Sequence, residues 1–160
     1  MFGLFKKEVE VISPMDGTVV PLEMVPDQAF AQKMVGDGVA IADLQGNIAC
    51  APVDGRVSLI FRTNHAFAVK TKEGIDILVH IGLDTVELNG EGFERLVEEG
   101  DVVKTGQPII RFDPAVIVNS GRSLCSPVII TSMENIAKLS VGLGGKVTAG
   151  QEVLFSYKEK

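Results

Sequence analysis

The sequence has little of what several common protein classes need. Tryptophan is absent, tyrosine occurs once, and only two cysteines are present among 160 residues. Two cysteines cannot build the disulfide framework of a small secreted scaffold, and they favour a reducing, cytoplasmic location. No apolar run approaches the roughly 20 residues needed to span a bilayer, so we do not expect an integral membrane protein.

Basic residues are also scarce. Lysine and arginine total 15 against 21 aspartates and glutamates, which gives a formal net charge of −6. Because a nucleic-acid binder needs cations that neutralise phosphates, this balance argues against nucleic acid as a partner.

What the chain does contain is apolar residues, glycines and turn sequences. Apolar residues make up 46% of the chain, and glycine occurs 17 times. Short apolar runs between turns are typical of strands rather than of a helix bundle. The turn sequence Pro14–Gly17 recurs as Pro52–Gly55, and Gly106-Gln107 recurs as Gly150-Gln151. These repeats indicate duplicated hairpin units that fold back on each other.

We therefore predict an all-β fold, an antiparallel β-sandwich or barrel-like single domain over residues 9–160, preceded by a flexible arm over residues 1–8. A few short helices are expected beside the strands. The apolar spacing predicts one helix over residues 92–99. Another is predicted over residues 113–118, because a proline at its second residue suits a first helical turn.

Only two histidines occur, His65 and His80. Alternation along a strand over residues 75–81 puts four aliphatic side chains on one face, which we expect to be core: Ile75, Ile77, Val79 and Ile81. The opposite face carries Asp76, Leu78 and His80. His80 is therefore predicted to point away from the core, beside an apolar neighbour.

The second histidine lies in the run 61–67. If this run is extended, one face carries Phe61, Thr63, His65 and Phe67. The Thr63 hydroxyl can then hydrogen-bond a ring nitrogen of His65 and fix its tautomer. Gly74 allows a turn, so that the two histidine runs pair as a hairpin and the imidazoles meet. Polar groups within an apolar rim fit a site where proteins dock.

Other interpretations of these residues remain open. His65 and His80 are candidate zinc ligands, and a zinc-dependent hydrolase is the main alternative, although catalytic zinc usually has three protein ligands. Asp84 follows His80 by four residues and either orients a ring, lies near a phosphate, or serves as a turn or capping residue. A swinging-arm carrier would need a lysine at a hairpin tip, and neither 14–17 nor 52–55 has one.

The histidine segments resemble a known family. Residues Ile77–Gly90 resemble the signature around the phosphorylated histidine of glucose-type IIA proteins of the bacterial phosphoenolpyruvate:sugar phosphotransferase system, and Thr63–Phe67 looks like that family's second histidine segment. Further matches run in order over roughly residues 9–158, at 25–31, 33–41, 51–55, 90–93 and 98–103. The resemblance implies an antiparallel β-sandwich with short helices.

The resemblance also implies a phosphoryl relay that drives sugar import. The phosphocarrier HPr would donate a phosphoryl group to Nε2 of His80, and the acceptor would be a cysteine on the IIB domain of a sugar permease. His65 would support the transfer, and Thr63 would orient His65. The protein would then act at the inner face of the membrane, with no required cofactor, a candidate zinc ion at the histidine pair, and regulatory targets as further partners.

Both partners must dock at one surface around the histidines. Motif match and strand parity predict six apolar residues for its rim: Val39, Ile41, Phe61, Phe67, Leu78 and Val86. An apolar rim would exclude water that could otherwise hydrolyse a phosphohistidine.

Overall fold

The computed structural model describes residues 7–142 and 144–160. Short runs rich in valine and isoleucine form its strands, and every strand pairing among these residues is antiparallel. The largest sheet holds, in spatial order, β13 (Gly145–Val147), β2 (Asp16–Pro21), β3 (Asp37–Gln45), β11 (Ser126–Ile130), β7 (Asp76–His80), β6 (Ala66–Lys70), β5 (Gly55–Ile60) and β9 (Val102–Val103). A second sheet holds β1 (Val9–Ile12), β14 (Val153–Glu159) and β12 (Ile136–Val141), and a third holds β4 (Ile48–Cys50), β10 (Pro108–Phe112) and β8 (Phe93–Arg95).

The helices are short. They are α1 (Gln28–Ala31), α2 (Pro114–Asn119) and the 3-10 helices η2 (Leu22–Met24), η3 (Thr85–Leu88) and η4 (Met133–Asn135). Within residues 7–142 and 144–160, none of them has the length and apolar composition needed to cross a membrane.

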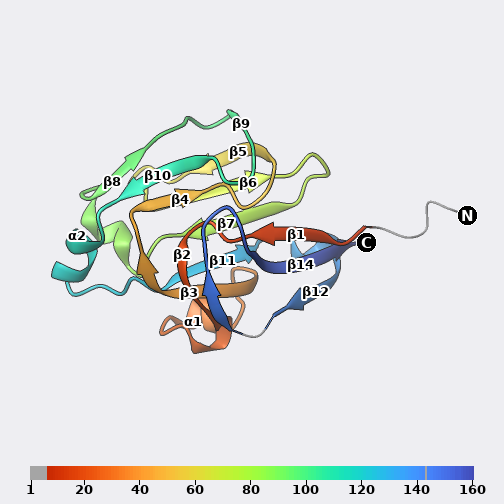
Figure 1. The fold of residues 1–160 in the computed structure, drawn as a ribbon, viewed down its shortest axis with the longest axis horizontal. Helices are drawn as coiled ribbons and strands as arrows, with labels where there is room; N and C mark the ends of the chain where they lie inside the picture. The colour runs from red at the N-terminus through yellow and green to blue at the C-terminus, as the bar shows by residue number, and fades with distance from the viewer. Residues whose placement is uncertain (1–6, 143) are drawn as a thin grey trace, which may run out of the picture.

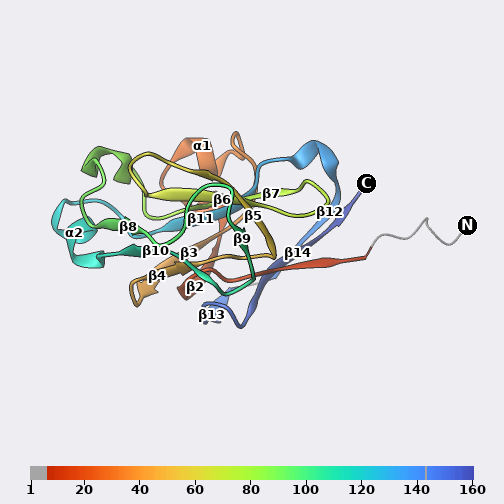
Figure 2. The ribbon, with the colours of Figure 1, turned by 90° about the horizontal axis from the view of Figure 1, so that it is seen from above.

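The central strands of the large sheet are buried on both faces. Figure 2 shows α1 on one side of β6, β7 and β11, and β4 and β10 on the other. The main core lies on the side of the smaller sheets and includes Phe67, Ile77 and Val79. A second apolar cluster lies on the α1 side and includes Phe30 and Leu78. In Figure 1 α1 projects from the opposite side to β8 and β10.

The predicted antiparallel β-sandwich is confirmed, and so are several of its details. The helix predicted over 113–118 is present as α2, shifted by one residue to Pro114–Asn119, with Asp113 as its N-cap. The repeated turns also meet in space, because a Cβ added to Gly106 would lie 3.5 Å from the Cα of Gly150. Both glycines have positive φ, +88° and +75°, which residues with a side chain rarely adopt.

The helix predicted over 92–99 is wrong. Residues 93–95 form β8 instead, and Phe93 pairs with Phe112 of β10. Both phenylalanine side chains are buried, so cross-strand packing outweighs the helical spacing of the apolar residues.

The flexible arm was predicted over residues 1–8, of which residues 1–6 lie outside the described residues. Glu8 is attached to the domain, because its carboxylate accepts a hydrogen bond of 2.8 Å from the Ser156 hydroxyl.

Candidate functional site

The hairpin of β6 and β7 brings the two histidines together, as predicted. Ala66 pairs with His80 across this hairpin, and the Ile81 amide donates a 2.8 Å hydrogen bond to the His65 carbonyl. The two imidazole centroids are 4.9 Å apart, with the rings at 79° to each other. Residues 15 positions apart in the sequence therefore form one site.

A turn positions His65, and the extended run predicted over 61–67 is wrong. The Asn64 amide donates to the Phe61 carbonyl at 2.7 Å, and Asn64 has φ of +63°. Asparagine tolerates this left-handed conformation better than most residues do. The predicted contact of Thr63 is nevertheless present, because its hydroxyl lies 2.5 Å from Nδ1 of His65.

The backbone of Gly82 fixes the ring of His80. Nδ1 of His80 donates to the Gly82 carbonyl at 2.7 Å. A carbonyl can only accept, so the hydrogen of a neutral His80 is on Nδ1 and the lone pair is on Nε2. Gly82 has φ of +73°, and an added Cβ would lie 2.8 Å from the Ser123 carbonyl oxygen. The position therefore requires glycine.

Both imidazoles are neutral at pH 7. His65 is 1% exposed, and burial together with the neighbouring His80 lowers its pKa to about 4. His80 is partly exposed, and burial lowers its pKa as well. The hydrogen bond to Gly82 and the charges of Asp27 and Asp84 oppose that shift of the His80 pKa. A neutral, partly exposed imidazole with a free Nε2 lone pair is a competent nucleophile.

Two phenylalanines flank the histidines. The ring of Phe30 meets His80 edge to face at 5.2 Å between centroids, and Phe61 meets His65 at 5.1 Å. Phe30 lies on α1, which Asp27 caps by accepting a 2.9 Å hydrogen bond from the Ala29 amide. Sequence reasoning did not assign Asp27 or Phe30 to the site, although both lie in the family-like segment 25–31.

The structure corrects most of the predicted rim. Val39, Ile41 and Phe67 are fully buried in the main core, and Leu78 is 6% exposed within the second cluster. Phe67 pairs with Val79, and Val39 pairs with Val128, so these side chains point to the main-core face of the sheet, opposite His80. Leu78 does lie on the His80 face, where the second cluster covers it. Of the remaining two predicted rim residues, Phe61 is half-buried and Val86 is 50% exposed, so only these can contribute to a docking surface.

Asp84 does not orient either ring through a hydrogen bond. It precedes η3 in the left-handed conformation, with φ of +57°, and its side chain caps nothing there. The carboxylate is exposed, and its charge favours the protonated form of His80. Asp84 therefore acts on His80 electrostatically, while the Gly82 carbonyl orients the ring.

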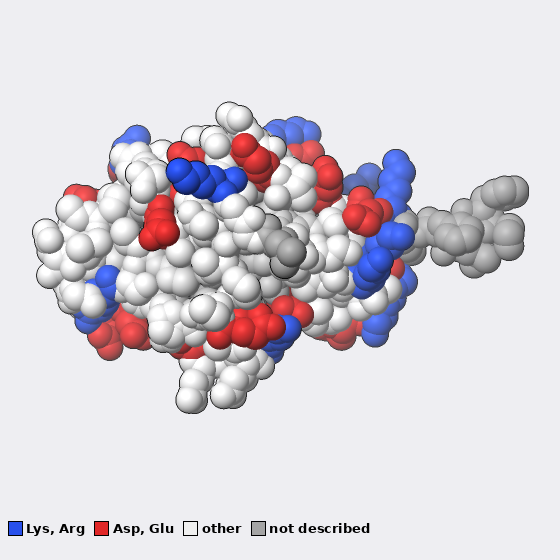
Figure 3. Space-filling model, turned by 60° about the horizontal axis from the view of Figure 1, so that its bottom comes forward, with Lys and Arg blue, Asp and Glu red and all other residues white. Residues whose placement is uncertain are grey.

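Figure 3 shows the side of the molecule on which α1 projects. Much of this surface carries neither acidic nor basic side chains; the largest group of basic ones lies at the end where the chain terminates, and the others are scattered. Exposed methionines Met24 and Met34 flank α1 in the sequence, each 72% exposed. Flexible apolar side chains of this kind adapt to more than one partner surface.

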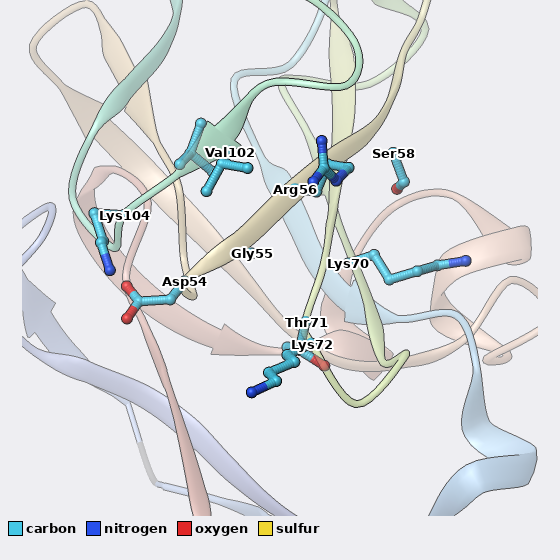
Figure 4. Close-up of a pocket in the computed structure, with 10 residues that line it drawn as sticks. Asp54, Gly55, Arg56, Ser58, Lys70, Thr71, Lys72, Val102 and Lys104 are labelled. Atoms are coloured by element: carbon cyan, nitrogen blue, oxygen red, sulfur yellow. The ribbon is translucent and has the colours of Figure 1, made fainter.

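A hollow of about 520 Å³ lies elsewhere, on β5, β6 and β9 (Figure 4). Its lining includes Arg56, Lys70, Lys72 and Lys104, and neither histidine borders it. This hollow is therefore separate from the histidine site.

The described residues do not complete a zinc site by themselves. Within 7–142 and 144–160 no group of three or more His, Cys, Asp or Glu side chains could hold a metal ion. Both Nδ1 atoms already have partners, which leaves one Nε2 from each of His65 and His80. A zinc ion held by these two nitrogens would need its other ligands from water or from a second molecule.

Comparison with known proteins identifies the family. Residues 9–136 match the family described as phosphoenolpyruvate-dependent sugar phosphotransferase system, EIIA 1. The chain belongs to this EIIA family. It is 45% identical over 152 residues to the PTS system glucose-specific EIIA component of Haemophilus influenzae, covering 95% of this chain and 90% of that one. The corresponding protein of Oceanobacillus iheyensis is 45% identical over 145 residues, with 91% and 87% covered.

Other relatives of this EIIA chain extend the comparison. The N-acetylglucosamine-specific EIICBA component of Klebsiella pneumoniae is 48% identical over 155 residues, which cover 96% of this chain and 24% of that protein. The solved structure of glucose permease IIA from Mycoplasma capricolum matches with a TM-score of 0.85 and 37% identity, over 96% of this chain and 97% of that chain. The EIIA chain is therefore a phosphotransferase-system phosphocarrier in sugar import, and the zinc-hydrolase alternative is not supported.

Proposed function

We propose that His80 accepts the phosphoryl group from phospho-HPr on Nε2 and passes it to the cysteine of a permease IIB domain. The observation that carries this proposal is the hydrogen bond from Nδ1 of His80 to the Gly82 carbonyl, which leaves Nε2 as the free nucleophile. The relay would operate at the cytoplasmic face of the membrane. The EIICBA relative, in which the matched segment makes up 24% of the protein, supports a permease as partner.

The first step is an attack by the Nε2 lone pair on phosphorus. A nitrogen–phosphorus bond forms on His80 while the bond between phosphorus and the donor atom of HPr breaks, and its electron pair returns to that donor atom. The hydrogen stays on Nδ1 of His80 and keeps its hydrogen bond to the Gly82 carbonyl. In the second step the IIB cysteine thiolate attacks phosphorus, and the electron pair of the nitrogen–phosphorus bond returns to Nε2. Phosphoryl transfer of this kind asks the protein mainly for positioning and charge stabilisation.

His65 is placed to stabilise the charge on the phosphoryl oxygens. If its Nδ1 accepts the Thr63 hydroxyl hydrogen, the ring hydrogen is on Nε2 and can be donated to a phosphoryl oxygen. The centroid separation of 4.9 Å keeps this donor beside the reacting nitrogen of His80. His65 would act as a neutral donor, since its pKa is about 4.

The test is incubation with phosphoenolpyruvate, enzyme I and HPr, followed by intact-mass measurement. The wild-type protein should gain one phosphoryl group that is acid-labile and base-stable, and His80→Gln should gain none. His65→Ala removes the N–H donor, and it should still accept the group but discharge it slowly to IIB. Loss of one hydrogen bond to a charged group costs about 1.5–3 kcal/mol, or about one to two powers of ten in rate. Acid-labile phosphate on His80→Gln would refute the assignment.

A further inference from the structure

Arg95 reaches the turn that precedes His65 from a different sheet. It lies on β8, and its Nε donates to the side-chain oxygen of Asn64 at 2.8 Å. A terminal guanidinium nitrogen also lies 3.4 Å from the Phe61 carbonyl oxygen. The Arg95 side chain is 29% exposed, so these contacts are shielded in part from water.

The two contacts hold both ends of one turn. Asn64 and Phe61 are already joined by the hydrogen bond that closes the turn, and Asn64 has the left-handed conformation that directs the chain into His65. Phe61 also packs its ring edge to face against His65. A shift of this turn would therefore move the imidazole, its aromatic neighbour and the Thr63 hydroxyl together.

We propose that Arg95 is a positioning residue for His65, acting through the side chain of Asn64 and the carbonyl of Phe61. The inference rests on the proposed role of His65 in phosphoryl transfer. A planar guanidinium can address two acceptors at fixed angles, whereas a lysine ammonium offers a single point charge. Glu98 lies 3.6 Å from another nitrogen of the same guanidinium and helps to set its orientation.

The test compares Arg95→Met with a matched control, Arg111→Met. Arg111 lies on the neighbouring strand β10 and pairs with Glu94 at 2.8 Å, away from the turn. We expect Arg95→Met to slow phosphoryl discharge to IIB roughly tenfold. A misplacement of about 1 Å in a reacting group can cost about a hundredfold in rate. The expected effect is smaller because Thr63 still holds the His65 ring. The KM for IIB should stay unchanged, and Arg111→Met should behave as wild type.

Asn64→Gly provides a second variant that keeps the left-handed backbone but removes the acceptor. A double variant combines Arg95→Met with Asn64→Gly. If Arg95 acts through Asn64, this double variant should discharge its phosphoryl group to IIB no more slowly than the slower of the two single variants. The ring resonances of His65 in NMR spectra should shift in Arg95→Met and Asn64→Gly, and stay in place in Arg111→Met. This readout does not depend on activity.

Three outcomes would overturn the inference: a wild-type discharge rate in Arg95→Met, an effect confined to KM, or unshifted His65 resonances. Failure of the proposed function looks different, because the wild-type protein itself would then accept no phosphoryl group from phospho-HPr.

Discussion

Acid should destabilise this protein through His65 well before its carboxylates are protonated. The His65 pKa is about 4 in the folded protein, because of burial and the nearby His80, against an ordinary value of 6.5. Between these two values the unfolded chain binds a proton that the folded chain does not. The stability that neutral His65 contributes is therefore complete above pH 6.5 and is lost as the pH falls towards 4.

The magnitude follows from the two pKa values. Lowering the pH from 7.5 to 5 should reduce the free energy of unfolding by about 2 kcal/mol through His65 alone. That loss would lower the midpoint of urea unfolding by about 1 M at a typical slope for a small protein. His80, whose pKa is also lowered by burial, adds a loss of the same sign.

The assay is urea unfolding of wild type and His65→Gln at both pH values. Glutamine does not titrate, so the variant should lose about 2 kcal/mol less than wild type between pH 7.5 and pH 5. Any cost of the substitution itself appears at both pH values and cancels in the difference. Equal losses in the two proteins, or an NMR titration midpoint of His65 near 6.5, would refute the reasoning.

Three further predictions concern buried side chains and one glycine of the fold. The lone Tyr157 has its pKa raised to about 12 by burial and the charge of Glu159, so its ultraviolet absorbance should show no phenolate at pH 10.5 until the protein is unfolded. Gly82→Ala should cost about 1–3 kcal/mol of stability through strain at positive φ, and thermal denaturation together with slower phosphorylation of His80 would show it. Phe67→Ala should lower stability by about 3–5 kcal/mol because the ring is core, whereas a loss of IIB affinity at unchanged stability would mean that Phe67 is a rim residue after all.

Local sequence determined the strands and the side of the sheet that His80 faces. Alternation over 75–81 places Ile77 and Val79 in the main core and His80 on the opposite face, as the structure has it. This works because side-chain direction along a strand has a period of two residues, so a short sequence is enough to specify it. Gly74 marked the turn that lets the hairpin pair His80 with Ala66.

Tertiary structure decided what covers each face. Leu78 shares the His80 face, and it is buried because the cluster that includes Phe30 covers that face. Val39, Ile41 and Phe67 are core rather than rim because the sheet pairing turns them towards the main core. The segment 93–95 became a strand because Phe112, from elsewhere in the chain, supplied a partner for Phe93. A local sequence pattern does not contain the information about which distant segment packs on a given face.

The same limit applies to the finer parts of the site. The sequence indicated Thr63 as the partner of His65, because the two residues are only two positions apart in the chain and so stay close in any local conformation. It could not indicate that Arg95 contacts Asn64, 31 residues away, or that Phe30 meets His80 across the sheet surface. These contacts depend on how β8 and α1 are packed against the hairpin, and that packing involves segments far apart in the sequence.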